Sequence, residues 1–577
     1  MQLRLRIYTI VSFVLFIVLI SRFFYWQIIR SKDLSDEVRP QHEKKSIEVA
    51  YRGKILASDG TVLVGQADSW NLFAEPKRMI NSNSDAEKLS QLLVEDVYDT
   101  KMLGEEVRRI ESLVSDKNKS WVPLKNRLTT EVKDQIEAQK IEGIGFDRDE
   151  VRVYPEASAA AQLLGFLGKN DISENQGYFG IEGFYHTTLS ASYGIEKRET
   201  DLRGLPILFG QSKSVPSYSG ADLVTYIDKG VQLMAEEELK NGVEKYGAVN
   251  GSVVVIDPST GGVLAMASVP SFDPRKYWEY ANDLFLNPVI SASFEPGSVF
   301  KIITMAAGLD SNAIDVDTKC DICSGPLRMG EYTIHTWNDQ YFPESSMTDI
   351  IVHSDNVGMV FVAQKTGIDK NLQYLEKFGL GKKTEIDLQG EMTPQLRKEK
   401  DWKEIDLATS SFGQGIAVTP IQMISAVNVI ANDGVSIKPK VVKQITVGDK
   451  VYTVQDSETG HRVISKNTAD EITQMMVEAA KYGESKWTYK RGYGVAGKTG
   501  TAQIPISGHY DAEKTVASFV GFAPYRNPKF IMLVTLREPK SSQWASETAA
   551  PLWYNIAERL FLHFGITPQP EYNRVLP

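Results

Sequence analysis

The sequence is poor in the residues that build metal sites and covalent scaffolds. Its 577 residues include two cysteines and seven histidines, too few for a cysteine-rich zinc module or a framework of several disulfides. Basic residues are also outnumbered, since 64 Lys and Arg stand against 74 Asp and Glu and leave a formal net charge of −10. This balance argues against a general nucleic-acid binder. We therefore expect no metal, no cofactor and no nucleic-acid partner.

The remaining composition is that of an ordinary folded protein, with 42% hydrophobic and 24% charged residues. At about 150 residues per domain, the length predicts two to four domains. The hydrophobic residues are unevenly spread, because the first thirty positions hold a dense block of them.

This N-terminal block predicts a membrane anchor. No charge interrupts Ile7 to Ile20, and the run continues to Ile29 if Arg22 snorkels to an interface lined by the aromatic residues 23–26. A cleaved signal peptide or a buried core helix is the alternative, but bulky aromatics stand where a cleavage site needs small residues. Arginines flank the block on both sides, so the charges leave its orientation open.

Turn and linker signals divide the rest of the chain. Residues 31–50 are polar, and Asp59-Gly60 between two β-like runs predicts a hairpin. Helical periodicity covers residues 85–114 after a cluster of capping residues at 81–84. A polar stretch from Phe209, rich in Ser, Gly and Pro, is the best linker. We predict three parts: a terminal tip and anchor (1–30), an α+β region (31–215) and a larger domain (216–577).

The larger region predicts an α/β domain. Two strand-like runs at residues 251–268 precede helical patterns through residues 300–430, and strand-like runs return at 516–522 and 530–536. Such an order favours a sheet assembled from both ends of the segment, with helices packed against it.

The strongest chemical signal is E-P-G-S-V-F-K from Glu295. A helix starting at Ser298 would place Lys301 on the same face, where an unprotonated amine could take the serine proton. Burial or a second cation would lower the lysine pKa as this requires. The plainer interpretation is an N-cap serine beside a solvated lysine. This is the chain's single S-x-x-K.

Two further short motifs follow at wide spacing. Ser354-Asp355-Asn356 offers a hydroxyl and an amide that could relay a proton and bind a peptide, although an isolated triplet of this kind is more often a capping box. Lys498-Thr499-Gly500-Thr501 precedes a strand-like run, so its lysine and hydroxyls could bind a carboxylate. A competing K-T-G at Lys365 ends a helical run, and we interpret it as structural.

The ordered set S-x-x-K, S-D-N and K-T-G is the signature of penicillin-binding proteins and class A β-lactamases. The chain resembles a class B penicillin-binding protein, the monofunctional peptidoglycan D,D-transpeptidase family. Pedestal-like boxes start at Arg52, Arg152 and Phe179, and transpeptidase-like boxes start at Ser411 and Phe519. The pedestal boxes depart from the family pattern at Ala57-Ser58, Glu156 and Gln162.

The resemblance implies an N-terminal transmembrane helix, an elongated α+β pedestal like the family's dimerisation domain, and a penicillin-binding/β-lactamase-like transpeptidase domain with an antiparallel sheet flanked by helices. It implies that Ser298 is acylated, that Lys301 is its general base, and that Ser354 relays the proton to the leaving D-alanine. Asn356 would hold the donor peptide, and Lys498 would lower the Lys301 pKa and orient Ser354.

The same resemblance assigns substrate binding to Thr499, Gly500 and Thr501, with the backbone NH groups of Ser298 and Thr501 as oxyanion hole. Partners would be D-Ala-D-Ala stem peptides, an acceptor amine, β-lactams as covalent inhibitors, the membrane and a SEDS-type glycosyltransferase. The catalytic domain would lie outside the cytoplasmic membrane and the N-terminus inside. Division is weakly favoured over elongation. A D,D-carboxypeptidase or β-lactamase, and a noncatalytic scaffold or β-lactam sensor, are the alternatives.

Two smaller features carry no functional prediction. Cys320 and Cys323 favour a local disulfide in an oxidising compartment, with free thiols as the alternative. We expect Trp337, Trp402 and Trp544 to pack in the interior rather than line a groove.

Overall fold

The computed structural model describes residues 2–34, 43–48, 50–94, 98–172, 174–199, 212–454, 460–506 and 509–573. The chain forms two compact units, Met1–Gly53 with Ser190–Gly220, and Lys54–Leu189 with Ala221–Pro577. Residues 35–42, 49 and 209–211, which belong to the predicted stalk and linker, lie outside the described residues. The boundaries predicted at residues 30 and 215 stay predictions.

The first unit contains the N-terminal apolar helix. Helix α1 (Gln2–Phe24) continues into the π-helical turn η1 (Tyr25–Ile29), and their side chains are almost all exposed. The 28-residue run contains an 18-residue window with a mean hydropathy of 2.3, and it is long and apolar enough to cross a membrane. The unit also holds an antiparallel sheet with the order β1 (Glu43–Glu48), β8 (Gly194–Glu199), β9 (Ser212–Val215).

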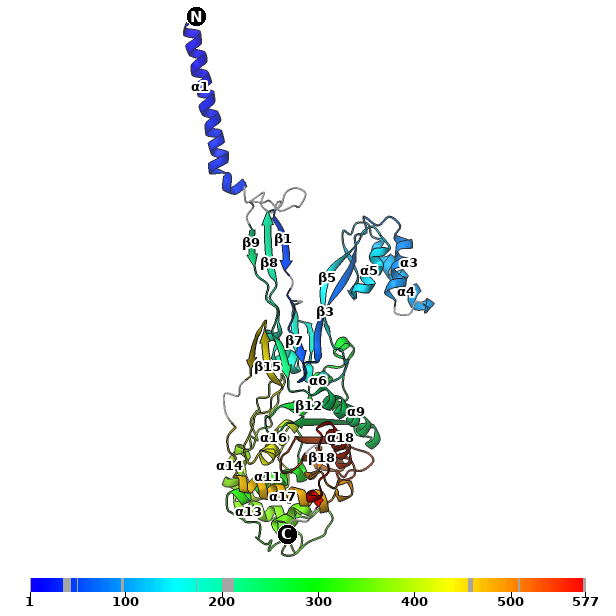
Figure 1. The fold of residues 1–577 in the computed structure, drawn as a ribbon, viewed down its shortest axis with the longest axis vertical. Coiled ribbons are helices and arrows are strands. Elements are labelled where there is room, and N and C mark those ends of the chain that lie inside the picture. Colours follow the sequence, from blue (N-terminus) through cyan, green and yellow to red (C-terminus); the bar gives the residue numbers. More distant parts are fainter. Residues whose placement is uncertain are drawn as a thin grey trace. The chain divides into compact units, whose positions relative to one another are not determined.

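A five-stranded antiparallel sheet forms the centre of the second unit (Figure 1). Its order is β12 (Val263–Val269), β11 (Asn250–Ile256), β19 (Phe530–Arg537), β18 (His509–Ala523), β17 (Ala496–Ile506). Strands from the two ends of the segment are therefore neighbours, which confirms the predicted α/β domain.

Helices cover both faces of this sheet. Because side chains alternate along a strand, Val253 and Val255 pack into the hydrophobic core beneath α9 (Lys229–Tyr246) and α18 (Ala549–His563). Val254 and Ile256 belong to the opposite core. That core contains the helices α11 (Lys301–Asp310), α16 (Pro420–Ala431) and α17 (Lys466–Tyr482).

Smaller helices surround this second core. They are α10 (Pro288–Ser291), α12 (Met347–Val352), α13 (Asn356–Thr366), α14 (Ile368–Lys377) and α15 (Glu404–Ser411), with 3-10 turns η2 (Pro274–Glu279), η3 (Asn282–Phe285), η4 (Gly297–Phe300), η5 (Glu399–Asp401), η6 (Lys486–Thr488) and η7 (Pro570–Asn573). A hairpin of β13 (Leu327–Met329) and β14 (Tyr332–Ile334) follows the Cys320–Cys323 disulfide. The predicted local disulfide is thus confirmed.

The N-terminal part of the second unit is the predicted α+β region. Strands β2 (Ile55–Leu56) and β3 (Val62–Ala74) form the predicted hairpin, with Gly60 at a φ of 87° in its turn. Strand β3 also pairs with β4 (Val122–Leu128) and β5 (Ile144–Val153). The helices α3 (Ser82–Leu93), α4 (Thr100–Val114) and α5 (Thr130–Ala138) pack beside these strands (Figure 1).

The helical stretch predicted for residues 85–114 is divided into two helices. Helix α3 (Ser82–Leu93) ends where Val94 turns extended, and Asp99 begins α4 (Thr100–Val114) by accepting hydrogen bonds from two backbone NH groups. A third helix, α5 (Thr130–Ala138), completes the cluster. Residues 95–97 lie outside the described residues.

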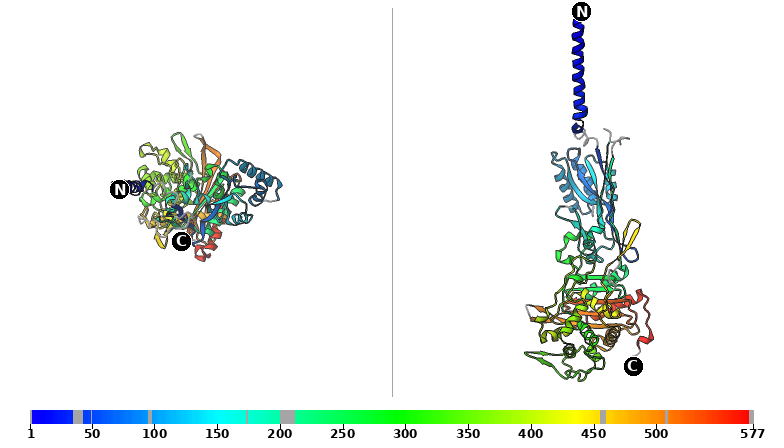
Figure 2. Two further views of the ribbon diagram at one scale, coloured as in Figure 1. Left: turned by 90° about the horizontal axis from the view of Figure 1, so that it is seen from above. Right: turned by 90° about the vertical axis from the view of Figure 1, so that its left-hand side faces the viewer.

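The pedestal sheet recruits strands from far along the chain. Strand β10 (Asp222–Thr225) pairs parallel to β2, and β15 (Val442–Val447) with β16 (Lys450–Thr453) extends the sheet beyond it. The β15–β16 hairpin stands out as the yellow strands in Figure 2. Nothing local in the sequence marks this pairing, because it joins segments more than 200 residues apart.

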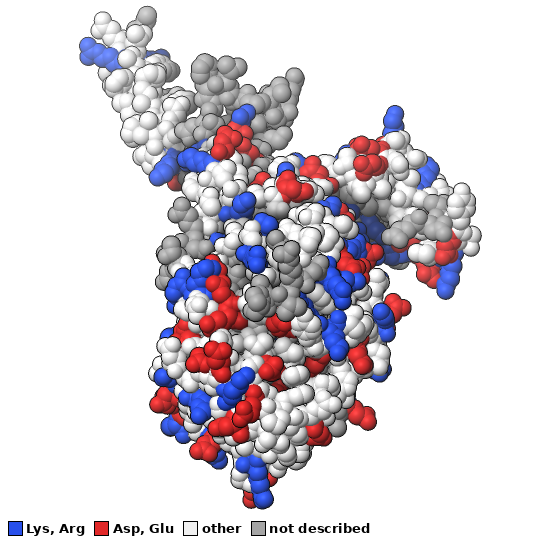
Figure 3. Space-filling view, turned by 60° about the horizontal axis from the view of Figure 1, so that its bottom comes forward, with Lys and Arg blue, Asp and Glu red and all other residues white. Residues whose placement is uncertain are grey.

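Short elements complete the pedestal: α6 (Ala161–Leu164), β6 (Phe166–Lys169), β7 (Asn175–Tyr178), α7 (Gly180–Phe184) and α8 (His186–Leu189). A buried ion pair links two of the predicted boxes, because Arg152 Nε lies 2.6 Å from Glu182 Oε1 and both side chains are almost fully buried. On the face shown in Figure 3, acidic and basic side chains are interspersed.

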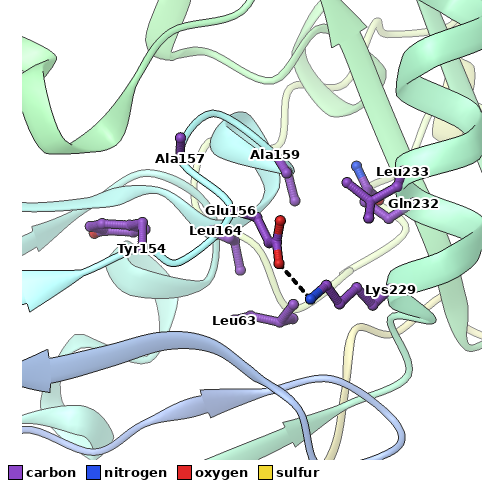
Figure 4. Close-up of a pocket in the computed structure, with 10 residues that line it drawn as sticks. Leu63, Tyr154, Glu156, Ala157, Ala159, Leu164, Lys229, Gln232 and Leu233 are labelled. Carbon is purple, nitrogen blue, oxygen red and sulfur yellow. Dashed lines mark ion pairs between the residues drawn. The ribbon is translucent and has the colours of Figure 1, made fainter.

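Two of the residues that depart from the family pattern, Glu156 and Gln162, contact the transpeptidase part of the chain. Glu156 and Lys229, at the start of α9, form an ion pair of 2.5 Å beside a cavity of about 10 Å³ (Figure 4). The amide of Gln162 donates to the carbonyl oxygens of Pro270 and Leu284. Both substituted residues therefore join the pedestal to the transpeptidase part within the same unit.

The buried ion pair generates a stability prediction. Glu182→Gln should lower the free energy of unfolding by about 3–5 kcal/mol, since it leaves the Arg152 charge buried without its counter-charge. As the matched control, Asp68→Asn removes the carboxylate of the partly exposed Arg148–Asp68 pair and should cost less than about 1 kcal/mol. Thermal unfolding of both variants checks this, and equal shifts in Tm would contradict it.

Candidate active site

Ser298 lies where a tight helical turn meets an edge strand. It belongs to η4, which runs directly into α11, as the sequence predicts. Gly297 precedes it with a φ of 55°, and a Cβ there would stand 2.7 Å from the Thr501 carbonyl oxygen. Gly500 is equally constrained, since its Cβ would meet Val299 at 2.6 Å. Glycine at both positions lets the serine turn approach β17 closely.

Lys301 is completely buried below this turn. Its Nζ donates to the Ser354 carbonyl oxygen at 2.5 Å, to Ser354 Oγ at 3.1 Å and to Asn356 Oδ1 at 2.8 Å. Among the hydrogen bonds of the described residues, none joins Nζ to the Ser298 hydroxyl. The second motif therefore orients the amine.

The second motif lies between α12 and α13. Ser354 is 1% exposed and has a φ of 56°, a conformation that costs free energy for a residue with a Cβ. Asp355 caps α13 by accepting from the Gly358 NH, and Asn356 donates from Nδ2 to the His335 carbonyl oxygen at 2.8 Å. The cap and this contact fix the Ser354 hydroxyl and the Asn356 amide in place.

Lys498 reaches the same hydroxyl from β17. Its Nζ donates to Ser354 Oγ at 3.1 Å and to Thr499 Oγ1 at 3.2 Å. Ser354 Oγ thus accepts from two lysines that come from opposite sides. Thr499 Oγ1 in turn donates to Glu484 Oε2 at 2.8 Å, and Thr501 Oγ1 accepts from the Ala545 NH at 3.0 Å. The three motifs therefore meet in one hydrogen-bonded cluster.

Burial and like charge determine the protonation of this cluster. Burial, followed by the charge of Lys498, lowers the pKa of Lys301 to about 7, while Glu484 and Asp355 oppose this shift. Burial also lowers the pKa of Lys498, again against Glu484. Near neutral pH, Lys301 is consequently the lysine that exchanges its proton readily.

A cleft of about 390 Å³ opens above the cluster. Ser298, Asn356 and Thr501 line it together with Glu484 and several residues of surrounding loops. Lys301 and Lys498 lie beneath this lining, being at most 3% exposed. The cleft can therefore hold a peptide against the serine, with both amines out of water.

Two of the three tryptophans were interpreted wrongly. Trp337 and Trp544 line the cleft, with ring centroids 5.4 Å apart, and Trp337 is 44% exposed. Trp402 packs against the hydrophobic core as expected. The loops that carry the first two residues meet only in the folded chain, so sequence spacing could not reveal the pair.

The structure also locates Lys365, which the sequence predicted to be structural, and two residues of the cleft that the sequence did not indicate. Lys365 is exposed in the last turn of α13, which Gly367 caps, in agreement with a structural role. Glu484 and His335 line the cleft, although no motif in the sequence marked either residue. In the described part of the chain, no three His, Cys, Asp or Glu side chains gather as a metal site would require.

Comparisons with known proteins agree with this arrangement. Residues 251–558 match the penicillin binding protein transpeptidase domain, and residues 47–225 match the penicillin-binding protein dimerisation domain. The chain therefore belongs to the penicillin-binding protein transpeptidase family. With the dimerisation domain and a single N-terminal apolar helix, it is a class B penicillin-binding protein.

Individual relatives cover almost the whole chain. The stage V sporulation protein D of Bacillus subtilis is 28% identical over 98% of this chain and 86% of its own length. The probable peptidoglycan D,D-transpeptidase PenA of Neisseria meningitidis is 28% identical over 96% and 92%. The crystal structure of penicillin binding protein 2X from Streptococcus thermophilus shares the fold with a TM-score of 0.73, at 23% identity over 91% and 80%.

The Lys301 environment predicts a pH dependence. Acylation by benzylpenicillin should rise as pH increases through about 7, because only the unprotonated amine can accept the serine proton. Below that pKa, the second-order rate constant should fall about tenfold per pH unit. Stopped-flow or gel-based acylation measured across this range checks the profile. A rate that does not change around neutral pH would contradict the role of this amine.

Proposed function

We propose that this protein is a membrane-anchored serine-type peptidoglycan D,D-transpeptidase that cross-links stem peptides through an acyl-Ser298 intermediate. The observation that carries the proposal is the contact of Lys301 and Lys498 with the single Ser354 hydroxyl, next to Ser298 at the floor of an open cleft. The family membership and the relatives named as D,D-transpeptidases support the same chemistry.

The first step forms the acyl-enzyme. Ser298 Oγ attacks the carbonyl carbon of the penultimate D-alanine, and unprotonated Lys301 accepts the serine proton. The C–N bond breaks as Ser354 passes a proton to the departing D-alanine amine, and Lys301 restores the proton to Ser354. Ser354 and Asn356 hold Nζ in the structure, so we propose that substrate binding brings it to Ser298 Oγ; catalytic hydrogen bonds commonly tighten only in the complex.

The cleft lining and the adjoining residues of β17 provide the remaining groups. The backbone NH groups of Ser298 and Thr501 form the oxyanion hole, where one donor is worth roughly 3–4 kcal/mol of transition-state stabilisation in other enzymes. Asn356 binds the donor peptide amide, Gly500 allows the close approach of the chain, and Thr499 and Thr501 bind the terminal carboxylate. The close approach of Gly297 to Thr501 supports this placement, since Ser298 directly follows Gly297 in the chain.

The second step transfers the acyl group to an amine. A neutral amine of a neighbouring stem peptide attacks the ester carbon and loses a proton to Lys301. The bond from the ester carbon to Ser298 Oγ then breaks as Lys301 returns that proton to Ser298 Oγ, which restores the free serine and the neutral lysine. Water in place of the amine would make the protein a D,D-carboxypeptidase or β-lactamase. The match of this chain to the penicillin-binding protein dimerisation domain, and to relatives named peptidoglycan D,D-transpeptidases, favours transfer to the amine.

The anchor determines where this chemistry occurs. The apolar run of α1 and η1 spans the cytoplasmic membrane with the N-terminus in the cytoplasm, because the peptidoglycan substrate lies on the outer side. A SEDS-type glycosyltransferase that supplies the glycan strand is the partner we propose for the anchor and pedestal. A role in division or spore formation is supported by relatives named FtsI and stage V sporulation protein D.

Labelling with a fluorescent penicillin tests the acyl-serine step. Wild-type protein in membranes should take one covalent label, and Ser298→Ala should take none, because the nucleophilic oxygen is absent. Ser311→Ala, at the C-cap of α11, is the matched control and should label like wild type. Unlabelled wild type, or a labelled Ser298→Ala variant, would refute the proposed mechanism.

The same preparations distinguish transfer from hydrolysis. Incubated with nascent glycan carrying pentapeptides, wild type should produce cross-linked peptide dimers, whereas predominant release of D-alanine without dimers would identify a carboxypeptidase. A protein that binds penicillin reversibly and makes neither product would be a sensor or scaffold.

Protease treatment of intact spheroplasts tests the orientation. We expect the region after residue 50 to be digested from outside, because the transpeptidase must face the cell wall. Removal of residues 2–29 should release the remaining chain from the membrane fraction, since this run is the described chain's candidate span. Protection of the large region until the membrane is permeabilised would reverse the proposed topology.

A further inference from the structure

Glu484 lies at the edge of the active site although it belongs to none of the three motifs. It follows α17 by two residues, is half-buried and lines the cleft. Its Oε2 accepts the hydroxyl of Thr499 at 2.8 Å. Of the residues that line the cleft, Glu484 is the one carboxylate, so it is the acidic group that a substrate meets there.

The contacts of the cluster form a continuous path that ends at this carboxylate. Lys301 and Lys498 both donate to Ser354 Oγ, Lys498 also donates to Thr499 Oγ1, and that hydroxyl donates to Glu484. The other members are buried, and Glu484 is partly exposed. The path thus runs from the amine beside Ser298 to a charge at the cleft wall.

Glu484 also affects the charge of the cluster. Three charged groups act on Lys301: Lys498 lowers its pKa, while Glu484 and Asp355 raise it. Asp355 is committed to capping α13 through the Gly358 NH. The charge of Glu484 also raises the pKa of Lys498, against the effect of burial. A carboxylate at position 484 therefore partly neutralises two buried amines at once.

A terminal carboxylate of the substrate would have to enter the same region. Under the proposed function, Thr499 and Thr501 bind that carboxylate, yet the Thr499 hydroxyl donates to Glu484. A hydroxyl has one proton to donate, so it can serve one carboxylate at a time. Binding must therefore transfer this hydrogen bond from the protein's carboxylate to the substrate's.

We propose that Glu484 is a positioning residue for acylation: its carboxylate holds the Thr499 hydroxyl and balances the charge of Lys301 and Lys498 until the substrate carboxylate takes its place. This inference rests on the proposed function. When the substrate carboxylate binds, it replaces Glu484 as the acceptor of Thr499, and the charge of Glu484 opposes its entry. Glu484 therefore affects both the pH at which acylation begins and the preference for anionic ligands.

Three variants of the full-length protein separate these effects. Glu484→Gln keeps an oxygen acceptor for Thr499 and removes the charge. Glu484→Asp keeps the charge and, being shorter, loses the contact. Glu478→Gln, one and a half turns earlier near the end of α17, removes a carboxylate for which no contact with the cluster is found among the described residues, and it serves as the matched control. Acylation rates are measured from about pH 5 to about pH 9 with benzylpenicillin and with its methyl ester, which lacks the carboxylate.

For Glu484→Gln, we expect the pH midpoint of acylation to fall by about half a unit, because Lys301 loses a neighbour that raises its pKa. Its preference for the free acid over the methyl ester should increase about threefold. Glu478→Gln should match wild type in both measurements. Glu484→Asp should keep the wild-type pH midpoint but acylate more slowly, because Thr499 is no longer held.

These outcomes distinguish the inference from the function on which it rests. Wild type that is not acylated refutes the proposed function itself. Wild type that is acylated, together with a Glu484→Gln variant of unchanged midpoint and unchanged ligand preference, overturns the role of Glu484 alone. If Glu484→Gln fails to fold, Glu484→Asp decides: acylation at the wild-type rate would equally overturn the role.

Discussion

Two positive charges buried against one oxygen atom are the constraint on which the active site depends. Lys301 and Lys498 are both inaccessible to water, and each donates to Ser354 Oγ at 3.1 Å. Two buried ammonium groups at this separation are mutually unfavourable, so one of them readily gives up its proton. The surrounding fold stabilises this arrangement. It holds Ser354 at a positive φ, caps α13 with Asp355, and places the carboxylates of Asp355 and Glu484 near the buried amines.

The same constraint explains why the site is built from three separate elements. A helix presents Lys301, a turn between helices presents Ser354, and an edge strand presents Lys498. Each lysine stem is packed in a rigid element, so neither amine can move away from the other into water. Gly297 and Gly500 allow the helix and the strand to approach closely enough for this contact.

Much of the active site could be predicted from the sequence, because the signals that mark its residues are local. The spacing of Ser298 and Lys301 needs one helical turn, and the strand context of Lys498 distinguished it from Lys365 at a helix end. Glu484 and the Trp337–Trp544 pair were missed because their positions depend on which loops meet after folding. The pairing of β15 with β10 was not predicted for the same reason. A partner strand more than 200 residues away does not affect the local periodicity of the sequence.

That last pairing has a consequence for how the chain is made. Strand β10 lies between β2 and β15, so the pedestal sheet stays incomplete until residues 442–447 have been synthesised and exported. Until then, the edge of β10 presents unpaired backbone groups, a surface on which nascent chains associate wrongly. The N-terminal region therefore cannot finish folding first, as the order of synthesis would otherwise allow. Its last strands arrive only after α16, so pedestal and catalytic domain mature as one cooperative unit.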